Sequence, residues 1–406
     1  RLAPIYLKLE SLRAELGSSD LSGELSLGRQ GMPSVHARLN SNRVNLEELT
    51  ITPDEEQAPP EQSSQAVAET PPAPATGTPA SPPAEDPAEP ARYVFREDPL
   101  PLDMLRQLEV DVEYRADQIV TPVSVIRDLE IDATARAGDI RTRIDVRGEH
   151  GGIAKQELAM TVSEQAAQLN TKLLARDLHL NLLSQGIEDP TLIPANDITL
   201  ELQAAGASPR DMAAGSNGRV LVTQGSGSIK NSMLGAVSGD IFAQLASALN
   251  PVSAQEEFTN WECSLLVLEI EDGQGELDPM ILQGEEVMIV GGGTIDLDNE
   301  KVRLEFNTKP REGIGVSADM FVTPFVALRG TLASPTVGLN ETGTVVTAGA
   351  AAATGGLSLL VTAAFDRATG EVDHCSKTLP EYPHPPLAGD AANTPPADAA
   401  SVAKKG

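Results

Sequence analysis

Aromatic residues are scarce in this sequence. Phe, Trp and Tyr make up 3% of the 406 residues, although hydrophobic residues as a whole make up 40%. Compact cores draw much of their burial from aromatic rings, so this chain must rely on Leu, Ile, Val and Ala instead. Such a composition suits an extended aliphatic surface.

Basic residues are also few. The 30 Lys and Arg residues oppose 59 Asp and Glu residues, which gives a formal net charge of −29. Nucleic-acid binding needs a basic patch or stripe, so the charge balance argues against DNA and RNA as partners. It also disfavours attachment to anionic lipid headgroups through charge alone.

Motifs for catalysis, cofactors and metal ions are missing. The sequence has no Gly-x-Ser-x-Gly elbow, no HExxH pair and no Walker phosphate loop. The run Gly291–Gly293 leads from one strand pattern into another, so we expect a bulge or a tight hairpin there. Asp296, Asp298, Glu300 and Glu305 lack EF-hand spacing and are expected on a solvated strand face. We therefore predict that the protein is not an enzyme and has neither a cofactor nor a metal site.

Most of the sequence between residues 99 and 340 alternates apolar and polar residues, as strands with one buried face do. In LEVDVEY, for example, Leu108, Val110 and Val112 share one face, and Glu109 and Asp111 share the other. The connections carry Gly, Asp, Asn and Pro, as antiparallel hairpins require, and no strand pattern alternates with a long helix. These patterns predict a mainly β fold of about seventeen strands.

Two helical segments are predicted beside the strands. Residues 229–250 carry apolar residues at four-residue spacing, which predicts one amphipathic helix that ends before Pro251. The segment 342–366 is rich in Ala, Gly and Thr. We expect a small-residue capping helix or helical hairpin there rather than a membrane span, because only strongly apolar side chains favour the bilayer.

The composition divides the chain into five segments. Residues 1–52 already show the strand pattern and are predicted to end a preceding β repeat, in a fragment whose targeting segment lies upstream. Residues 53–98 form a Pro, Ala and Glu-rich insert and residues 380–406 a Pro and Ala-rich tail, and both are expected to be disordered. The remaining segments are the β region at 99–340 and a segment at 341–379 with the capping helix and the second cysteine.

Strands with one aliphatic and one charged face can be buried in two ways. Two sheets can pack together around a filled core, or one curled sheet can keep its apolar face for a ligand, and periodicity does not distinguish the two. Composition alone favours the filled core. In an open groove, acyl chains would bind by roughly 0.8 kcal/mol per buried CH₂ group. The candidate lining residues of such a groove are Val110, Val112, Ile131, Ala133, Ile144, Val146, Leu200, Leu202, Leu266, Leu268, Ile295, Leu297, Leu304 and Phe306.

Four stretches of the sequence resemble one known family. LPLDMLRQLEVDVEYRADQI, which begins at Leu100, resembles the segment before the last module of AsmA family proteins. GSGSIKNSMLGAVSGDIFAQLASALNP is similar to the family's Gly-rich strand end and the helix after it. The family's most recognisable stretch is similar to FTNWECSLLVLEIEDGQGELDPMILQGEEVMIVGGGTIDLDNEKVRLEFNTKP. The family's closing helix is similar to TGGLSLLVTAAFDR. The resemblance covers residues 99–380 and rests on structural motifs, not on catalytic ones.

The resemblance implies a periplasmic protein that is anchored to the inner membrane by an N-terminal segment. It implies an elongated, curled antiparallel sheet with an apolar groove for phospholipid or another acyl lipid, and a part in outer-membrane lipid homeostasis or biogenesis with other envelope proteins as partners. The alternative is a structural or assembly factor for outer-membrane proteins with a closed β core. In an oxidising periplasm, Cys263 and Cys375 would either form a disulfide or remain two separate thiols.

Overall fold

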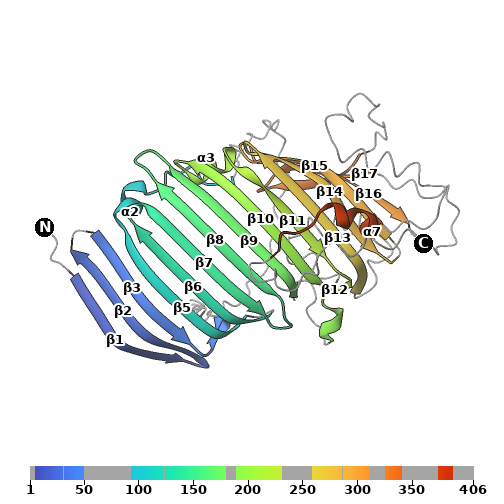
Figure 1. Cartoon of the computed structure of the whole chain (residues 1–406). Helices are drawn as coiled ribbons and strands as arrows, with labels where there is room; N and C mark the ends of the chain where they lie inside the picture. The colour runs from blue at the N-terminus through green and yellow to red at the C-terminus, as the bar shows by residue number, and fades with distance from the viewer. Residues whose placement is uncertain are drawn as a thin grey trace, which may run out of the picture.

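One large sheet accounts for most of the structure. A computed structural model describes residues 5–30, 32–49, 93–121, 124–179, 189–230, 258–285, 287–310, 325–340 and 374–386. Within these ranges, 18 strands form a single sheet in which most strands follow each other in chain order (Figure 1). Neighbouring strands of the described residues are antiparallel, except that β3 and the short β4 run parallel to β5.

The strands are β1 (Ile5–Leu16), β2 (Ser19–Gln30), β3 (Met32–Ser41), β4 (Val44–Asn45), β5 (Glu109–Val120), β6 (Val125–Arg136), β7 (Asp139–Gly148), β8 (Ile153–Val162), β9 (Ala167–His179), β10 (Ala195–Gly206), β11 (Asn217–Gln224), β12 (Gly227–Lys230), β13 (Phe258–Glu271), β14 (Gln274–Gly284), β15 (Val287–Asp296), β16 (Lys301–Pro310), β17 (Phe325–Thr331) and β18 (Pro335–Asn340). The helices of the described ranges are short: α1 (Leu46–Leu49), α2 (Leu102–Gln107), α3 (Pro209–Ala214), α7 (His374–Thr378) and the 3-10 turns η1 (Pro190–Leu192) and η5 (Leu379–Glu381). The predicted mainly β fold is confirmed.

Tight turns explain why the strands pair with their neighbours in the sequence. Ala137 and Gly138 connect β6 to β7, and Asp272 and Gly273 connect β13 to β14, all with φ between 46° and 85°. Two-residue hairpins favour such turns because their twist matches the twist of the strands, and Gly reaches positive φ at no steric cost. Each of these hairpins can therefore form from residues that are close in sequence.

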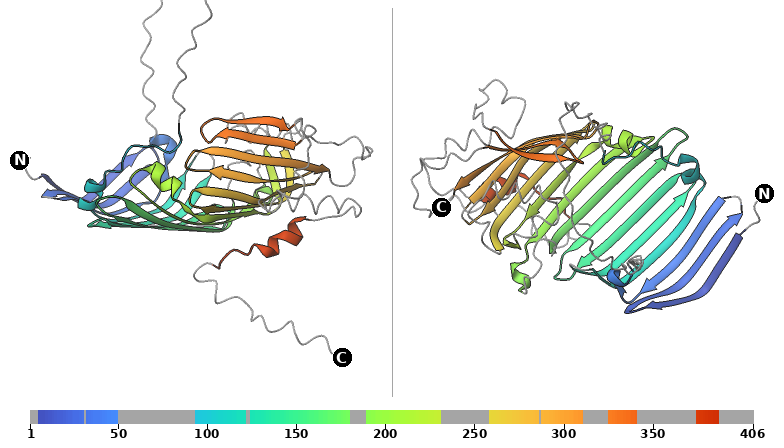
Figure 2. Two further views of the ribbon diagram at one scale, coloured as in Figure 1. Left: turned by 90° about the horizontal axis from the view of Figure 1, so that it is seen from above. Right: turned by 180° about the vertical axis from the view of Figure 1, so that it is seen from behind.

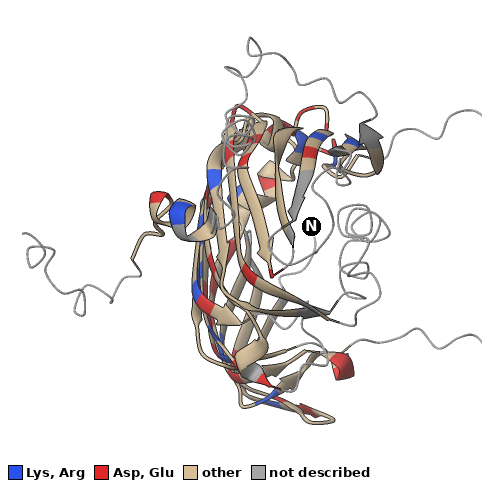
Figure 3. Ribbon diagram, turned by 90° about the vertical axis from the view of Figure 1, so that its right-hand side faces the viewer, with Lys and Arg blue, Asp and Glu red and all other residues tan. Residues whose placement is uncertain are grey.

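The sheet is curled into a trough with two different faces. Figures 2 and 3 show α7 against the outer, convex side of the curl. The strand residues packed beneath α7 therefore point to the convex side, and the residues that alternate with them point to the concave side. The buried convex residues around Cys375 are Leu221, Cys263, Leu265, Val267, Ile281, Met288 and Val290.

One segment runs past distant hairpins along one edge of the sheet, meaning here the side where the strands end and turn. In this edge segment, residues 93–101, the backbone N–H of Leu100 donates to the carbonyl of Ala207 (2.7 Å), and the N–H of Arg210 donates to the carbonyl of Arg96 (3.1 Å). The guanidinium of Arg210 also stacks on the ring of Tyr93, 3.8 Å from its centre. Helices α2 and α3 lie along the same edge (Figure 1). The prediction that the disordered insert extends to residue 98 is thus wrong for residues 93–98, because backbone and side-chain contacts fix them.

The remaining segment predictions have mixed outcomes. Residues 5–49 belong to the same sheet as the rest, because β3 pairs with β5. Residues 380–386, predicted as part of a disordered tail, pack on the sheet instead. The predicted helix at 229–250 overlaps β12 at its first two residues, and the rest of it lies outside the described residues, as does the segment 342–366. Within the described part of the chain, the helices are too short or too polar to cross a bilayer.

Candidate functional site

One row of residues crosses the whole sheet. Residues directly opposite each other on neighbouring strands point to the same side of a sheet, so the strand register determines which residues share a face. Ile144 of β7 pairs with Ile131 on one side and with Gln156 on the other, and the pairing continues to both edges. This apolar row consists of Leu12, Gly23, Leu39, Tyr114, Ile131, Ile144, Gln156, Leu173, Leu200, Val220, Leu268, Leu277, Gly293, Leu304, Leu328 and Val337.

The apolar row lies on the concave face. Its members Leu277, Leu304 and Leu328 belong to a hydrophobic cluster that is separate from the one beneath α7. Next to them, Leu265 and Val267 alternate with the row residue Leu268 along β13 and point to the convex side. The row therefore follows the inside of the curl.

The register brings the predicted lining residues together with one exception. Val110 and Val112 pair with Ala135 and Ala133, and the other predicted residues in strands occupy the row or positions two residues from it on the same face. Leu297 is the exception, because it follows the end of β15 and belongs to no strand. The shared face is a structural fact, whereas contact of these residues with lipid stays a prediction.

The concave face carries no charge at or beside the apolar row in β5–β11. These strands define the open half of the sheet, where most of the side chains concerned are only half buried. The exceptions are Ala116, Leu129, Ala135, Ala175 and Ala204, which are buried. The concave positions are Val110, Val112, Tyr114, Ala116, Leu129, Ile131, Ala133, Ala135, Ile140, Thr142, Ile144, Val146, Ala154, Gln156, Leu158, Met160, Leu169, Thr171, Leu173, Ala175, Ile198, Leu200, Leu202, Ala204, Val220 and Val222.

The same face is closed at the other end of the sheet. In β13–β18, the closed half, Phe306 is 3% exposed, Leu304 is 8% exposed and Val326 is fully buried. These side chains form one cluster, against which Trp261 and Met280 pack. A filled core and an open apolar face, which the sequence presented as alternatives, therefore occur in different parts of the same sheet.

The three glycines at 291–293 contribute to the closed half. The expected bulge lies on the β14 side of these positions, where Leu277 pairs with Gly293 and Met280 pairs with Gly291, so that two residues of β14 face Gly292 alone. On the other side, Gly291, Gly292 and Gly293 pair in unbroken register with Phe306, Glu305 and Leu304. A Cβ atom at Gly291 would collide with the Phe306 ring, and one at Gly293 would collide with the backbone of β16. The glycines thus make room for large side chains on the neighbouring strand.

The convex face carries a charge ladder directly behind the apolar row. The ladder consists of Arg38, Glu113, Asp132, Arg143, Glu157, Lys172, Glu201, Arg219, Glu269 and Glu276, each opposite the next. Ion pairs join Arg143 to Glu157 (3.2 Å) and Arg219 to Glu269 (2.9 Å). Beside the ladder, a hydrogen bond from the Arg38 guanidinium lowers the pKa of the Asp111 carboxyl. One face of the sheet is therefore aliphatic and the other is ionic.

A hollow of about 500 Å³ lies on this ionic face. Its lining includes Asp132, Arg143, Glu157, Lys172 and Glu201. Charged side chains of the lining pair with one another, as Arg143 does with Glu157 and Lys172 with Glu201, so their charges are already balanced. We therefore place the candidate binding surface on the concave face, where half-buried aliphatic groups remain partly exposed to water and a ligand could cover them.

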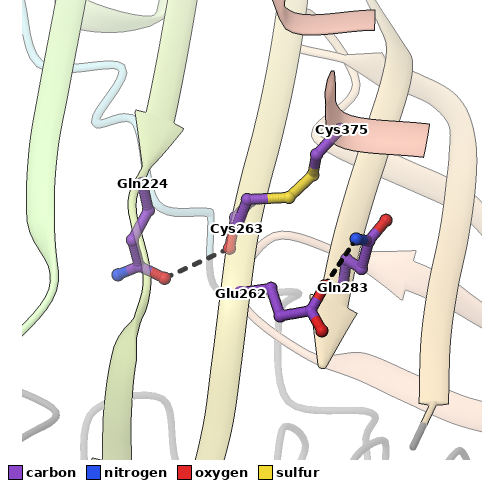
Figure 4. The surroundings of a disulfide bond; sticks show 6 residues. Gln224, Glu262, Cys263, Gln283 and Cys375 are labelled. Carbon is purple, nitrogen blue, oxygen red and sulfur yellow. Dashed lines mark hydrogen bonds between the residues drawn. A yellow bond between two sulfur atoms is a disulfide. The ribbon is translucent and has the colours of Figure 1, made fainter. Parts of the chain in front are cut away.

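A disulfide fastens the end of the described chain to the convex face. Cys263 of β13 is bonded to Cys375 of α7, with their Cα atoms 6.5 Å apart (Figure 4). From there the C-terminal segment, residues 374–386, packs Leu379 and Tyr382 on the convex cluster. Nη2 of Arg176 on β9 donates to the carbonyl of Pro385 in this segment. The segment thus spans several strands and braces the convex face.

His384 connects this segment to two neighbouring strands. Its Nδ1 lies 2.9 Å from the hydroxyl of Thr199 on β10, and its Nε2 lies 2.9 Å from the hydroxyl of Thr223 on β11. Burial lowers the pKa of His384, and the nearby charge of Arg176 lowers it further, while Asp197 opposes them. The neutral ring is therefore favoured, with one nitrogen donating and the other accepting.

We expect acid to loosen the C-terminal segment. The pKa of His384 is lower in the folded chain, so the unfolded state takes up the proton first as the pH falls. The contribution of His384 to the stability of the fold is therefore complete above a pH of about 6.5 and declines as the pH falls toward the folded-state pKa. The protection of the backbone amides of residues 379–386 against hydrogen exchange, relative to the intrinsic exchange rate at each pH, should therefore fall between pH 7 and pH 5. In His384→Gln, which keeps hydrogen-bonding groups but does not titrate, this part of the pH dependence should vanish. Equal pH dependence in both proteins would refute the assignment.

A buried acid that the sequence analysis placed in solvent proves to be structural. Glu300 is fully buried, and its two carboxylate oxygens accept the backbone N–H groups of Val94 and Phe95, both at 2.7 Å. Asp296 instead accepts from the backbone N–H groups of Asp298 and Asn299 in the same turn. The expectation of a solvated strand face is wrong for Glu300, because its partners lie 206 and 205 residues away in the sequence.

Comparisons with known proteins add no assignment. Neither the models of protein families, nor the curated proteins, nor the solved structures include a match to this chain.

Proposed function

We propose that this chain is a non-enzymatic, AsmA-like periplasmic protein that holds or passes the acyl chains of phospholipid on its concave face. The observation that carries the proposal is the uncharged, mostly aliphatic face of β5–β11, much of which is only half buried while charges occupy the opposite side. Each CH₂ group that such a face removes from water contributes roughly 0.8 kcal/mol. Binding of this kind needs no catalytic group.

The resemblance of residues 99–380 to AsmA family proteins supplies the setting of the proposal. An anchor in the inner membrane would keep the sheet in the periplasm, where the apolar row can shield acyl chains from water on the way to the outer membrane. The disulfide between Cys263 and Cys375 agrees with such a setting, because disulfides persist in oxidising compartments.

A charge on the open half should remove bound lipid without unfolding the protein. Val112 is half buried on the concave face, so Val112→Asp places a carboxylate where an acyl chain would have to desolvate it. We expect the phospholipid that co-purifies with the protein, measured by mass spectrometry, to fall by about tenfold, the effect of 1.4 kcal/mol. Thr134→Asp is the matched control, because Thr134 is exposed on the convex face of the adjacent β6.

The same experiment tests the alternative of a structural or assembly factor with a closed core. The buried cluster of the closed half favours that alternative. If the open half were closed in the same way, Val112→Asp would unfold the chain, and wild-type protein purified under mild conditions would carry no phospholipid. Either result would overturn the lipid-holding proposal.

A further inference from the structure

A glutamine interrupts the apolar row in the middle of the open half. Gln156 of β8 lies directly between Ile144 of β7 and Leu173 of β9. Its strand continues on the same face with Leu158 and Met160. The side chain is half buried, and it occupies a position where every other row residue of the open half is aliphatic or, at Tyr114, aromatic.

The amide of Gln156 has no hydrogen-bond partner among the described residues. Other glutamines differ in this respect: Gln118 accepts from Arg43 (2.7 Å), Gln224 donates to Asn196 (3.2 Å), and Gln283 donates to Glu262 (2.8 Å). Water can satisfy a half-buried amide while the face is empty. An acyl chain laid across the row would remove that water, and an amide left without a partner opposes binding.

Two threonines flank the glutamine on the same face. Thr142 of β7 and Thr171 of β9 both pair with Leu158, two residues along from Gln156, so their Cβ atoms lie diagonally from it at about 7 Å. The hydroxyl of Thr171 donates to the carbonyl of Glu157 (3.2 Å). The three side chains form a small polar spot within an aliphatic surface.

The charge of the surroundings decides which polar group the spot suits. The concave positions at and beside the row in β5–β11 carry no Lys, Arg, Asp or Glu. A phosphate group would be desolvated there without a compensating charge, which is unfavourable. A neutral acceptor, such as the carbonyl oxygen of an acyl ester, needs only a donor such as the amide of Gln156.

We propose that Gln156 donates a hydrogen bond to the ester carbonyl of the lipid on the concave face. The inference rests on the proposed function and adds a specificity to it. The ester group lies over β8, and the acyl chain extends from it across the aliphatic residues on one side. Ester-linked lipids are therefore bound in preference to ether-linked lipids of the same length, which lack the carbonyl.

Competition between two lipids tests this inference. The full chain is incubated with vesicles that contain equal amounts of diacyl phosphatidylethanolamine and its dialkyl ether analogue of the same chain length. The two lipids bound to the re-isolated protein are then counted by mass spectrometry. We expect wild-type protein to prefer the ester by roughly fivefold, the effect of one net hydrogen bond.

Two variants complete the test. Gln156→Leu makes the row fully aliphatic, so its ester-to-ether ratio should fall to about one while total bound lipid is kept or raised. Gln203→Leu, an exposed position on the convex face of β10, should keep the wild-type ratio. A wild-type ratio of one, or a preference that survives in Gln156→Leu, would overturn the inference and leave the lipid-holding function intact. Absence of both lipids from wild-type protein would overturn both.

Discussion

Leu304→Asp is expected to lower the free energy of unfolding by about 4 kcal/mol or more, which would make it the most destabilising of the substitutions considered. Leu304 is 8% exposed in the cluster of the closed half. The substitution removes a buried aliphatic group and places an unpaired carboxylate among apolar side chains, and each change is strongly unfavourable. Urea denaturation followed by the fluorescence of Trp261, the single Trp of the chain, would measure it, because Trp261 packs against this cluster.

Arg303→Asp is the control for that experiment. Arg303 precedes Leu304 but is exposed on the opposite face, so its replacement should change the free energy of unfolding by less than about 1 kcal/mol. A small effect of Leu304→Asp as well would mean that the closed half is not a packed core. Leu304→Asp and Val112→Asp together distinguish the two halves of the sheet. Leu304→Asp should destabilise the fold, and Val112→Asp should displace the ligand.

The second large effect is expected from loss of the disulfide. Cys263 and Cys375 are 112 residues apart in the sequence, and a bond that closes a long loop restricts the unfolded chain strongly. Replacement of both with Ser should therefore cost about 2–4 kcal/mol. The C-terminal segment would also lose its covalent attachment to β13. Thermal melting measures the first effect, and protease sensitivity of residues 374–386 measures the second.

Reducing agent supplies the control for the disulfide experiment. Dithiothreitol should lower the melting temperature of wild-type protein toward that of the double variant and leave the double variant unchanged. Identical melting of oxidised and reduced wild-type protein would contradict the expected contribution of the bond. A fall in the melting temperature of the double variant as large as that in wild-type protein would also contradict it, because the variant has no disulfide to reduce.

The sequence was most informative where structure depends on near neighbours. Alternation predicts the strand faces correctly at residues such as Val112, Ile144 and Leu200, and the Asp272-Gly273 turn is typical of a two-residue hairpin. Alternation does not reveal what covers a face. The difference between half-buried Val112 and buried Leu304 arises from the curl of the whole sheet, so their similar patterns gave no warning of it.

Features that depend on distant pairs were missed. Glu300 looked like one more surface acid, because Val94 and Phe95, its partners, follow a Pro-rich stretch in a different part of the chain. The packing of His384 could not be inferred for the same reason. Gln156 differs, because in IAKQELAM it occupies an apolar position of the alternation. A polar residue at an apolar position of an alternating pattern can be recognised from the sequence alone.

The two faces of the sheet also protect the alignment of its strands during folding. If β7 slipped by one residue against β8, Arg143 would turn toward the concave face and Ile144 toward the convex face. The charged Arg143 on the aliphatic face would be enough to disfavour that misalignment. A slip of two residues preserves which side each group occupies, but it would set Arg143 against Lys155 or Ala159 in place of Glu157. Only the ionic side opposes this second error. A meander of near-identical hairpins can in this way settle on a single alignment although much of it lacks a conventional interior.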